Sequence, residues 1–214
     1  MFFGHMSKYI ARRGFIRDHY ENLTNKIMNK AKRVNIIDEY FNKDSVKKIN
    51  DFFAKVITGK LEEESGGRFS YLINGKKLKI ENLATGLKAF SILKLLFDNG
   101  YISSDTLLII DEPEVHLHPQ WQIILAELIT LFIRELGANI VLTSHSPYFI
   151  EAIDTYSDAY EIKDMTNFYL TLKTNNNTST FENVNSSLAK VYNLLSYPFD
   201  ILQKVKLEGQ NDNK

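Results

Sequence analysis

The chain has 214 residues, of which 44% are apolar, with no cysteine and with 26 basic against 26 acidic side chains. This composition describes one folded domain or two small ones, and it excludes a disordered or collagen-like chain, a disulfide framework and thiol catalysis. The zero net charge hides a division, because residues 1–60 carry 13 Lys and Arg against 6 Asp and Glu, whereas residues 61–214 carry 13 against 20. The lack of cysteine favours a cytoplasmic location, and no apolar stretch reaches the roughly 20 residues of a membrane span.

The first part of the chain is basic and has the period of amphipathic helices. Apolar residues recur at three- and four-residue steps between Gly14 and Ile57, which predicts two or three helices. Two interpretations of the basic residues stay open: a solvated helical pair that covers a sheet, or a nucleic-acid face that binds DNA with strong salt dependence and little sequence preference. The residues concerned are Arg12, Arg13, Arg17, Lys30, Lys32, Arg33, Lys47 and Lys48.

The run of Glu62 to Glu64 followed by Ser65 and two glycines predicts a boundary. We therefore expect a basic helical segment over residues 1–64, a second domain over 65–205 and a disordered tail over 206–214. Directly after the boundary, two short apolar runs flank Asn74-Gly75, a pair that favours a type I′ turn because both positions need a positive φ. The sequence thus predicts a hairpin of strands 69–73 and 76–80.

The middle of the chain has the pattern of a strand-helix-strand unit. A helix near 87–99 precedes a continuous apolar run, residues 106–110, which predicts a buried parallel strand. Pro119 suits the first turn of the next helix, Gly137 ends it, and residues 138–143 form a second buried strand. Ser146 and Pro147 then suit the N-cap and first position of another helix. Beyond it we expect strands near 159–162 and 168–172, a loop over 174–180 and a short helix near 186–195.

Carboxylates and a histidine follow the two buried strands. Asp111 and Glu112 come where the first strand ends, and adjacent residues of an extended chain point to opposite sides. One carboxylate can hold a metal ion through water while the other polarises an attacking water, as phosphoanhydride hydrolysis requires. His145 lies one strand-helix-strand crossover later, which returns it to the same edge of the sheet. The spacing predicts a site at that edge.

Three segments resemble motifs of ABC-type ATPases, in the branch with the RecF, SMC-like and overcoming-lysogenisation-defect proteins. Residues 107–119, LLIIDEPEVHLHP, resemble the Walker B and D-loop regions, and residues 143–147, TSHSP, resemble the switch-histidine region. Residues 82–88, NLATGLK, resemble the signature motif. The resemblance covers residues 68–165, with the three motifs in the family's order and spacing.

This resemblance implies an α/β fold, the C-terminal lobe of a P-loop NTPase with parallel central strands and flanking helices. It implies ATP and Mg²⁺ as cofactors, with Asp111 binding Mg²⁺ through water and Glu112 acting as the general base. His145 would hydrogen-bond the γ-phosphate, and His116 and His118 would lie in the D-loop at a dimer interface. The implied biological role is DNA maintenance, DNA repair or phage defence.

The signature segment has its own implied role, as part of a site shared between two subunits. The resemblance places Ala84, Thr85 and Gly86 at a helix N-terminus that faces the γ-phosphate held by an opposing subunit, either a second copy or another chain. The family's usual serine is replaced by Ala84, so Thr85 would have to supply a hydroxyl.

The phosphate-binding loop of this family, Walker A, has no counterpart in the sequence. No segment reads Gly-x-x-x-x-Gly-Lys-Ser/Thr, and the nearest, residues 58–61, lacks the earlier glycine and the hydroxyl. Between Leu95 and Met165 there are twelve Asp and Glu but only two Lys and Arg. This charge suits the part of a site that holds the metal ion and the attacking water, and not the part that binds the triphosphate. The chain thus resembles the C-terminal half of the ATPase, with the Walker A lobe absent, divergent or supplied by another chain.

Other interpretations of the same residues stay open. The chain would be a non-catalytic partner if it contributes only the signature face to a complex. It would be a metal-dependent hydrolase if His116 and His118 ligate zinc or manganese together with Asp111 or Glu114. Structural roles are open too, since Thr85 is a suitable N-cap and His145 a suitable packing residue at a strand-helix junction.

Overall fold

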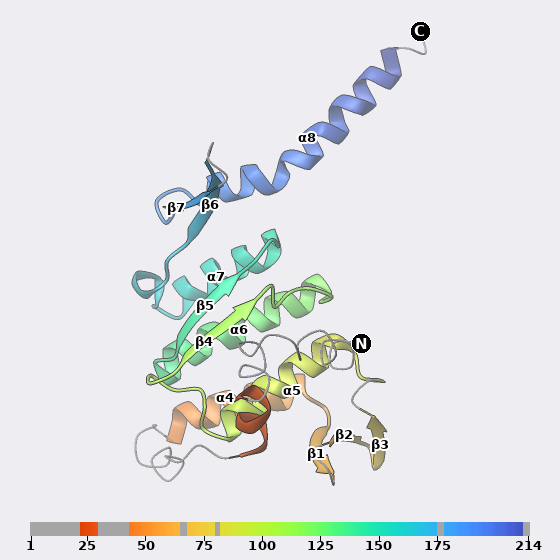
Figure 1. Cartoon of the computed structure of the whole chain (residues 1–214), viewed down its shortest axis with the longest axis vertical. Helices are drawn as coiled ribbons and strands as arrows, with labels where there is room; N and C mark the ends of the chain where they lie inside the picture. Colours follow the sequence, from red (N-terminus) through yellow and green to blue (C-terminus); the bar gives the residue numbers. More distant parts are fainter. Residues whose placement is uncertain (1–21, 30–42, 65–67, 80–81, 175–177, 212–214) are drawn as a thin grey trace.

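A computed structural model describes residues 22–29, 43–64, 68–79, 82–174 and 178–211 (Figure 1). A short helix over residues 22–28 precedes the labelled elements. These are α4 (Lys43–Val56), β1 (Lys60–Glu64), β2 (Arg68–Ile73), β3 (Lys76–Lys79), α5 (Thr85–Asp98), β4 (Leu107–Asp111), α6 (Pro119–Leu136), β5 (Asn139–Thr143), α7 (Pro147–Ala159), η2 (Lys163–Met165), β6 (Tyr169–Lys173), β7 (Ser179–Asn183) and α8 (Ala189–Asn211).

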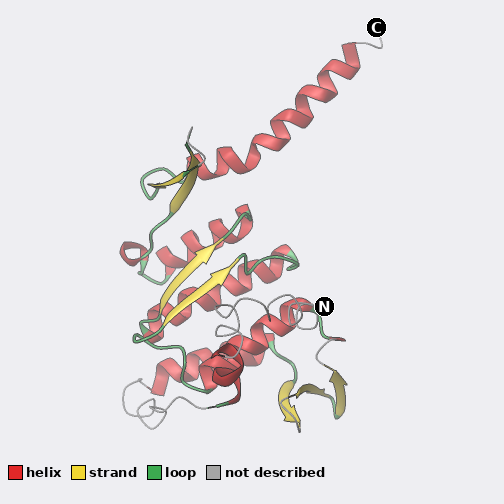
Figure 2. Ribbon diagram, in the orientation of Figure 1, coloured by secondary structure: helices red, strands yellow, loops and turns green. Residues whose placement is uncertain are grey.

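The centre of the fold is the predicted strand-helix-strand unit. Strands β4 and β5 pair in parallel, in the register Leu107 with Asn139 through Asp111 with Thr143, and α6 makes the crossover. Helices α6 and α7 lie side by side along one face of this pair (Figure 2). Gly137 ends α6 in the left-handed conformation at φ 64°, as its position predicts. The predicted class, α/β with parallel central strands and flanking helices, is confirmed.

An aromatic cluster joins the helices that surround the unit. The ring centroid of Phe132, from α6, lies 6.2 Å from that of Phe53 in α4 and 6.1 Å from that of Phe97 in α5. All three side chains are buried. Because each ring removes a large apolar area from water, this cluster fixes α4 and α5 against α6.

Helix α4 is also held to α6 by a carboxylate, and this contact has a testable pH dependence. Glu135 accepts hydrogen bonds from Ser45 Oγ at 2.6 Å and Lys48 Nζ at 2.9 Å, and its side chain is 7% exposed. Burial alone would raise the pKa of Glu135, but the bonds from Ser45 and Lys48 outweigh it and hold the pKa below its usual value. Ionisation of Glu135 therefore stabilises the folded chain.

We expect Glu135→Gln to lower the free energy of unfolding by about 1–2 kcal/mol at pH 7. A lowered pKa in the folded state means that the stabilisation is present above the ordinary value of 4.5 and is lost as the pH falls through the folded-state value. Urea unfolding measured between pH 7 and pH 3 gives the free energy of unfolding of both proteins. The difference between variant and wild type should become smaller below pH 4.5. Glu182→Gln, in an exposed pair with Lys190, is the control with little effect. A gap that does not change with pH would contradict this origin of the stabilisation.

The hairpin around Asn74 is confirmed, but the segment before it is not a linker. Asn74 and Gly75 have φ of 49° and 75°, as a type I′ turn requires, and β2 pairs with β3 around them. Glu62 to Glu64, with which the expected boundary begins, belong to β1 (residues 60–64), which pairs antiparallel with β2. Glu62 and Glu64 are tolerated in a strand because Lys77 lies 3.6 Å and 3.8 Å from their carboxylates. The expected division at residues 64 and 65 stays a prediction, with β1 and β2 pairing across it.

The C-terminal part differs from the prediction in three places. Residues 160–162 are a turn rather than a strand, because α7 continues to Ala159 and η2 follows. Strand β6 is confirmed, but its partner β7 was not predicted, and it begins at Ser179, within the loop expected over 174–180. The short helix expected near 186–195 is α8, which begins at Ala189 and continues to Asn211. The expected disordered tail is therefore helical as far as that residue, and α8 projects away from the rest of the chain (Figure 1). None of the described helices has the length and hydropathy needed to cross a membrane.

Strands β4 and β5 are covered on one face only, whereas the sequence predicts two buried strands. The side chains of Leu108, Ile110, Ile140 and Leu142 pack against the core. On the opposite face Leu107 is 59% exposed, Ile109 68% and Val141 49%. Parallel sheets normally have both faces covered. The prediction of burial is therefore right for one face and wrong for the other, over which the described residues form no layer. We call Leu107, Ile109 and Val141 the open sheet face.

Most of the basic residues proposed for a nucleic-acid face lie outside the described residues: Arg12, Arg13, Arg17, Lys30, Lys32 and Arg33. Of the two that are described, Lys47 is exposed and Lys48 pairs with Glu135. Lys48 therefore has a structural role in holding α4 to α6, whereas Lys47 is open to solvent.

Candidate functional site

At the carboxyl edge of β4 and β5, Thr143 contacts both Asp111 and Glu112, a role that the sequence did not predict for it. Thr143 Oγ1 donates a hydrogen bond to Asp111 Oδ1, its partner across the parallel pair. The backbone N–H of Glu112 donates to Thr143, at 3.0 Å to Oγ1 and 3.2 Å to the carbonyl oxygen. The hydroxyl of Thr143 thus orients the Asp111 carboxylate and fixes the backbone of Glu112.

Glu112 and His145 meet at this edge. The Nε2 atom of His145 lies 3.2 Å from Oε1 of Glu112, although 33 positions separate the two residues in the sequence. Glu112 has a φ of 44°, a region that residues other than glycine rarely adopt, and the turn it begins is closed by a 3.1 Å bond from the N–H of Val115. The side chain of Glu112 is 42% exposed and that of His145 82%, so both reach solvent.

The donor set at this edge fits Mg²⁺ held through water. Asp111 presents carboxylate oxygens at an exposed strand end, and Mg²⁺ prefers one or two carboxylates together with waters and substrate phosphates. Within the described part of the chain, no three His, Asp or Glu side chains gather as a complete set of metal ligands. Asp111 is therefore suited to a site completed by water and phosphate, and not to a cage made by protein alone.

The signature segment lies at the start of α5 and lines a separate hollow of about 410 Å³. Its N-cap is Ala84, which makes no side-chain capping bond, so the interpretation of Thr85 as the N-cap is wrong and Thr85 is the first helical residue. The first N–H groups of α5 thus have no side-chain cap and no acidic residue in the first turn. Gly86 lets the helix approach Leu117 closely, since a Cβ there would lie 2.9 Å from Leu117 Cδ2.

His116 and His118 line the same hollow as Ala84, Thr85 and Gly86. The structure therefore assembles the predicted residues into two groups: Asp111, Glu112 and His145 at the sheet edge, and the signature segment with the two histidines at the hollow. His118 is the N-cap of α6, with its Nδ1 accepting a 3.3 Å bond from the N–H of Gln120. His116 has a φ of 67° in the turn between the groups.

The zinc or manganese alternative is not supported by this arrangement. Glu114, one of its proposed ligands, is 6% exposed and binds residues 144–146 through its carboxylate. His118 already uses Nδ1 as a cap.

Sequence reasoning missed the network around Glu114. Its Oε1 accepts hydrogen bonds from Ser144 Oγ, His145 N and Ser146 N. A nearby buried side chain, Gln122, accepts a bond from Ser146 Oγ at 2.5 Å. A polar residue at a buried helical position, such as Gln122 among the apolar residues of α6, was the only sign of this network in the sequence.

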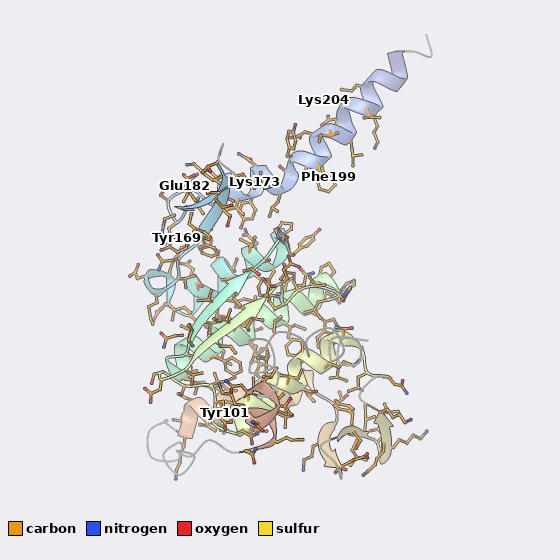
Figure 3. The ribbon with its side chains drawn as sticks, viewed as in Figure 1. Tyr101, Tyr169, Lys173, Glu182, Phe199 and Lys204 are labelled. Carbon is orange, nitrogen blue, oxygen red and sulfur yellow. The ribbon has the colours of Figure 1, made fainter. Side chains whose placement is uncertain are left out.

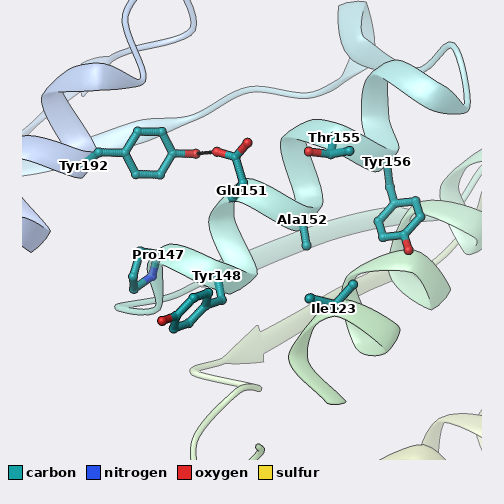
Figure 4. Close-up of a pocket in the computed structure, with 8 residues that line it drawn as sticks. All are labelled: Ile123, Pro147, Tyr148, Glu151, Ala152, Thr155, Tyr156 and Tyr192. Carbon is teal, nitrogen blue, oxygen red and sulfur yellow. Dashed lines mark hydrogen bonds between the residues drawn. The ribbon is translucent and has the colours of Figure 1, made fainter. Parts of the chain in front are cut away.

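A second hollow, of about 470 Å³, lies where α6, α7 and α8 approach one another (Figure 4). Tyr148 and Tyr156 line it, and the Tyr192 hydroxyl donates a 2.5 Å bond to Glu151 at its rim. Burial, together with this bond, raises the pKa of Tyr192. None of the residues predicted for the site lines this hollow.

Comparison with known proteins identifies a family and a fold. A family model described as an AAA ATPase domain matches residues 6–150. A solved SMC head domain with a coiled coil and joint, from Pyrococcus yayanosii, is 18% identical with a TM-score of 0.50, over 72% of this chain and 29% of that one. This likeness shows the fold, that of the SMC ATPase heads, which are P-loop NTPases. No curated protein gives a significant match.

Two further solved structures match with lower TM-scores. One, from work on ATP-driven dimerisation and DNA-stimulated activation of SMC ATPases, is 16% identical with a TM-score of 0.47, over 82% of this chain and 98% of that one. The other is an SMC head domain with an extended coiled coil, bound to the C-terminal domain of ScpA, from Pyrococcus furiosus. It is 17% identical with a TM-score of 0.44, and the match spans 76% of this chain and 37% of that one.

Proposed function

Because the chain belongs to the AAA ATPase domain family, whose model matches residues 6–150, we propose that it supplies the catalytic and signature side of an ATP-hydrolysing site. This membership confirms the ATPase family that the sequence motifs predict. The chain is an ATPase module related to the AAA and SMC ATPases. The observation that carries the proposal is the 3.2 Å contact between Glu112 and His145 at the carboxyl edge of β4 and β5. Ligands of open α/β sheets bind at such edges.

In this proposal the residues have separate tasks. Asp111, oriented by Thr143, holds Mg²⁺ through water, and the ion supplies charge neutralisation on the phosphates when bound. Glu112 accepts a proton from the attacking water, and His145 donates a hydrogen bond to the γ-phosphate. The N–H groups at the start of α5, with Thr85 and Gly86, accept the γ-phosphate of a nucleotide held by an opposing subunit. His116 and His118, in the same hollow, lie at that subunit interface.

The proposal includes a partner lobe that carries the phosphate-binding loop. The sequence has no such loop, and the only two basic residues between Leu95 and Met165 have other contacts. Arg134, in the last turn of α6, lies 5.4 Å from the ring centroid of Tyr160, and Lys163 Nζ lies 3.5 Å from Asp154 Oδ1. Arg134 lies near the C-terminal end of α6 and Lys163 follows that of α7, whereas Glu112 precedes the N-terminal end of α6. The open sheet face is the surface that a lobe with further strands and helices would cover.

The biological setting that we propose is DNA maintenance, DNA repair or phage defence in the cytoplasm, with a homodimer or a complex with a Walker A-bearing chain as the active form. The excess of basic residues before residue 61 supports DNA as a partner.

If DNA binds, its affinity should fall steeply with salt. Each phosphate contact contributes about 0.9 to the slope of log K against log salt concentration, so five contacts give a loss of roughly 500-fold between 50 and 200 mM salt. Fluorescence anisotropy with labelled duplexes of two unrelated sequences measures both the salt dependence and the sequence preference of binding. Equal affinity at the two salt concentrations, or a strong preference for one sequence, would contradict this mode of binding.

The ATPase proposal is tested on the complex that the chain forms in its own cells. A tagged copy of the chain is purified under mild conditions, and the release of phosphate from ATP is measured with and without Mg²⁺. We expect hydrolysis that requires Mg²⁺ and that depends on Glu112 of the tagged chain. If wild-type and Glu112→Gln complexes hydrolyse ATP at the same rate, the chain is a non-catalytic partner that contributes the signature face alone.

A further inference from the structure

The loop that carries His145 is fixed by one buried carboxylate, that of Glu114. Its Oε1 accepts three hydrogen bonds, from Ser144 Oγ at 2.6 Å, His145 N at 2.9 Å and Ser146 N at 3.2 Å. Glu114 is 6% exposed, and its other oxygen, Oε2, is buried without a hydrogen-bond partner in the described part of the chain. One carboxylate oxygen thus joins three donors of the 144–146 loop.

The turn that carries Glu114 is strained on both sides. Glu112, two residues before, has a φ of 44°, and His116, two residues after, has a φ of 67°. Each such conformation costs about 1 kcal/mol or more and persists only where the surroundings over-determine it. The bonds of the Glu114 side chain tie the middle of this turn to the neighbouring loop, in addition to the turn's own backbone bonds.

A second side chain connects the same two segments. Gln122 donates from Nε2 to the carbonyl oxygen of Leu117 at 3.0 Å and accepts on Oε1 from Ser146 Oγ. Ser146 is the N-cap of α7. The turn at 112–118 and the loop at 144–146 are thus joined through buried polar groups. Loss of one member would leave the other without a hydrogen bond, which destabilises the folded chain.

We propose that Glu114 is a positioning residue that couples the 112–118 turn to His145. Because its carboxylate binds the backbone N–H of His145, a displacement of the turn displaces the histidine, and the contact between Glu112 and His145 is kept only while the turn has the described conformation. The turn also carries His116 and His118, which line the signature hollow, so a partner that binds at that hollow would change the position of His145. The importance of this coupling for hydrolysis rests on the proposed function, whereas the coupling itself belongs to the chain.

Amide hydrogen exchange on the isotope-labelled full chain tests the coupling. In Glu114→Gln the acceptor loses its charge, and we expect exchange at the amides of His145 and Ser146 to be at least about 10-fold faster than in wild type. Exchange in the core of α6 should be unchanged. The matched control is Glu151→Gln, which alters an exposed carboxylate of α7 that is bonded to Tyr192. Equal exchange at His145 in the two variants would overturn the proposal.

A spectroscopic readout separates positioning from general stability. The ring signal of His145 should shift when Glu112 is replaced by glutamine, since the two side chains are in contact at 3.2 Å. We expect this response to persist in Glu151→Gln and to be lost in Glu114→Gln. An undiminished response in Glu114→Gln would overturn the proposal.

A variant at the other end of the contact keeps the proposal testable if Glu114→Gln does not fold. Ser144→Ala removes one donor to Glu114 and leaves the carboxylate in place. It should accelerate exchange at His145 by a smaller factor, and no acceleration there would overturn the proposal. None of these measurements requires nucleotide. An absence of ATP hydrolysis would therefore remove the proposed function while the coupling is still measured independently.

Discussion

Replacing Glu112 with glutamine is expected to lower the rate of ATP hydrolysis by the complex at least about 100-fold, the usual contribution of a general base. Glutamine keeps the size of the side chain and an acceptor oxygen near His145, but it cannot take the proton of the attacking water. ATP-dependent association should persist, because the N–H groups of α5 and Asp111 are untouched. On the same preparation, phosphate release measures the rate of hydrolysis and light scattering measures ATP-dependent association.

Glu161→Gln is the matched control for this prediction. Glu161 is also an exposed glutamate with a positive φ, 59°, but it follows α7 at the opposite end of the unit. We expect its hydrolysis rate to equal that of the wild type. If Glu112→Gln lost association as well as hydrolysis, the effect would be one of assembly, and the role of Glu112 as the base would be contradicted.

Replacing Ile109 with lysine is expected to weaken association with the Walker A-bearing lobe by about 100-fold, a loss typical of a central interface residue. Ile109 is 68% exposed on the open sheet face, so the charge is solvated in the free chain and the free energy of unfolding should change little. In the complex the same ammonium group would be buried without a partner, which is costly. Titration of the tagged chain against its purified partner measures the affinity.

Met165→Lys is the control for surface charge. Met165 is similarly exposed, at 65%, but lies in η2, away from the sheet face. Its affinity for the partner should match that of the wild type. Unchanged affinity in Ile109→Lys would show that the partner lobe does not cover this face.

How far the sequence predicts the site is seen by comparing Glu112 with Glu114. Glu112 and His145 follow two parallel strands, so their meeting at one edge follows from strand period and crossover length alone. Glu114 lies two residues from Glu112 in the same acidic segment, and no local pattern distinguishes a buried hydrogen-bond acceptor from a solvated carboxylate. Its role depends on the direction of one side chain, which reaches a residue 30 positions later in the sequence.

The long C-terminal helix shows the same limit. The sequence predicts a short helix near 186–195 and a disordered tail, yet α8 continues through Pro198 to Asn211. Its apolar side chains, Phe199 among them, remain largely exposed, and Figure 3 shows Phe199 and Lys204 beyond the hairpin of Tyr169 and Glu182. A helix that packs against little of its own chain has no regular apolar face to reveal its length.

The sequence by itself determined the features that depend on neighbouring residues: the turn at Asn74-Gly75, the start and end of α6 at Pro119 and Gly137, the parallel unit and the residues at its carboxyl edge. Backbone preferences and side-chain periods act over a few positions, and a single sequence contains them completely. Only the tertiary structure decided that β1 is a strand, that one face of β4 and β5 is open, and that Glu114 holds His145. These features depend on which distant groups compete for the same hydrogen bonds and buried surface, and no local pattern records that outcome.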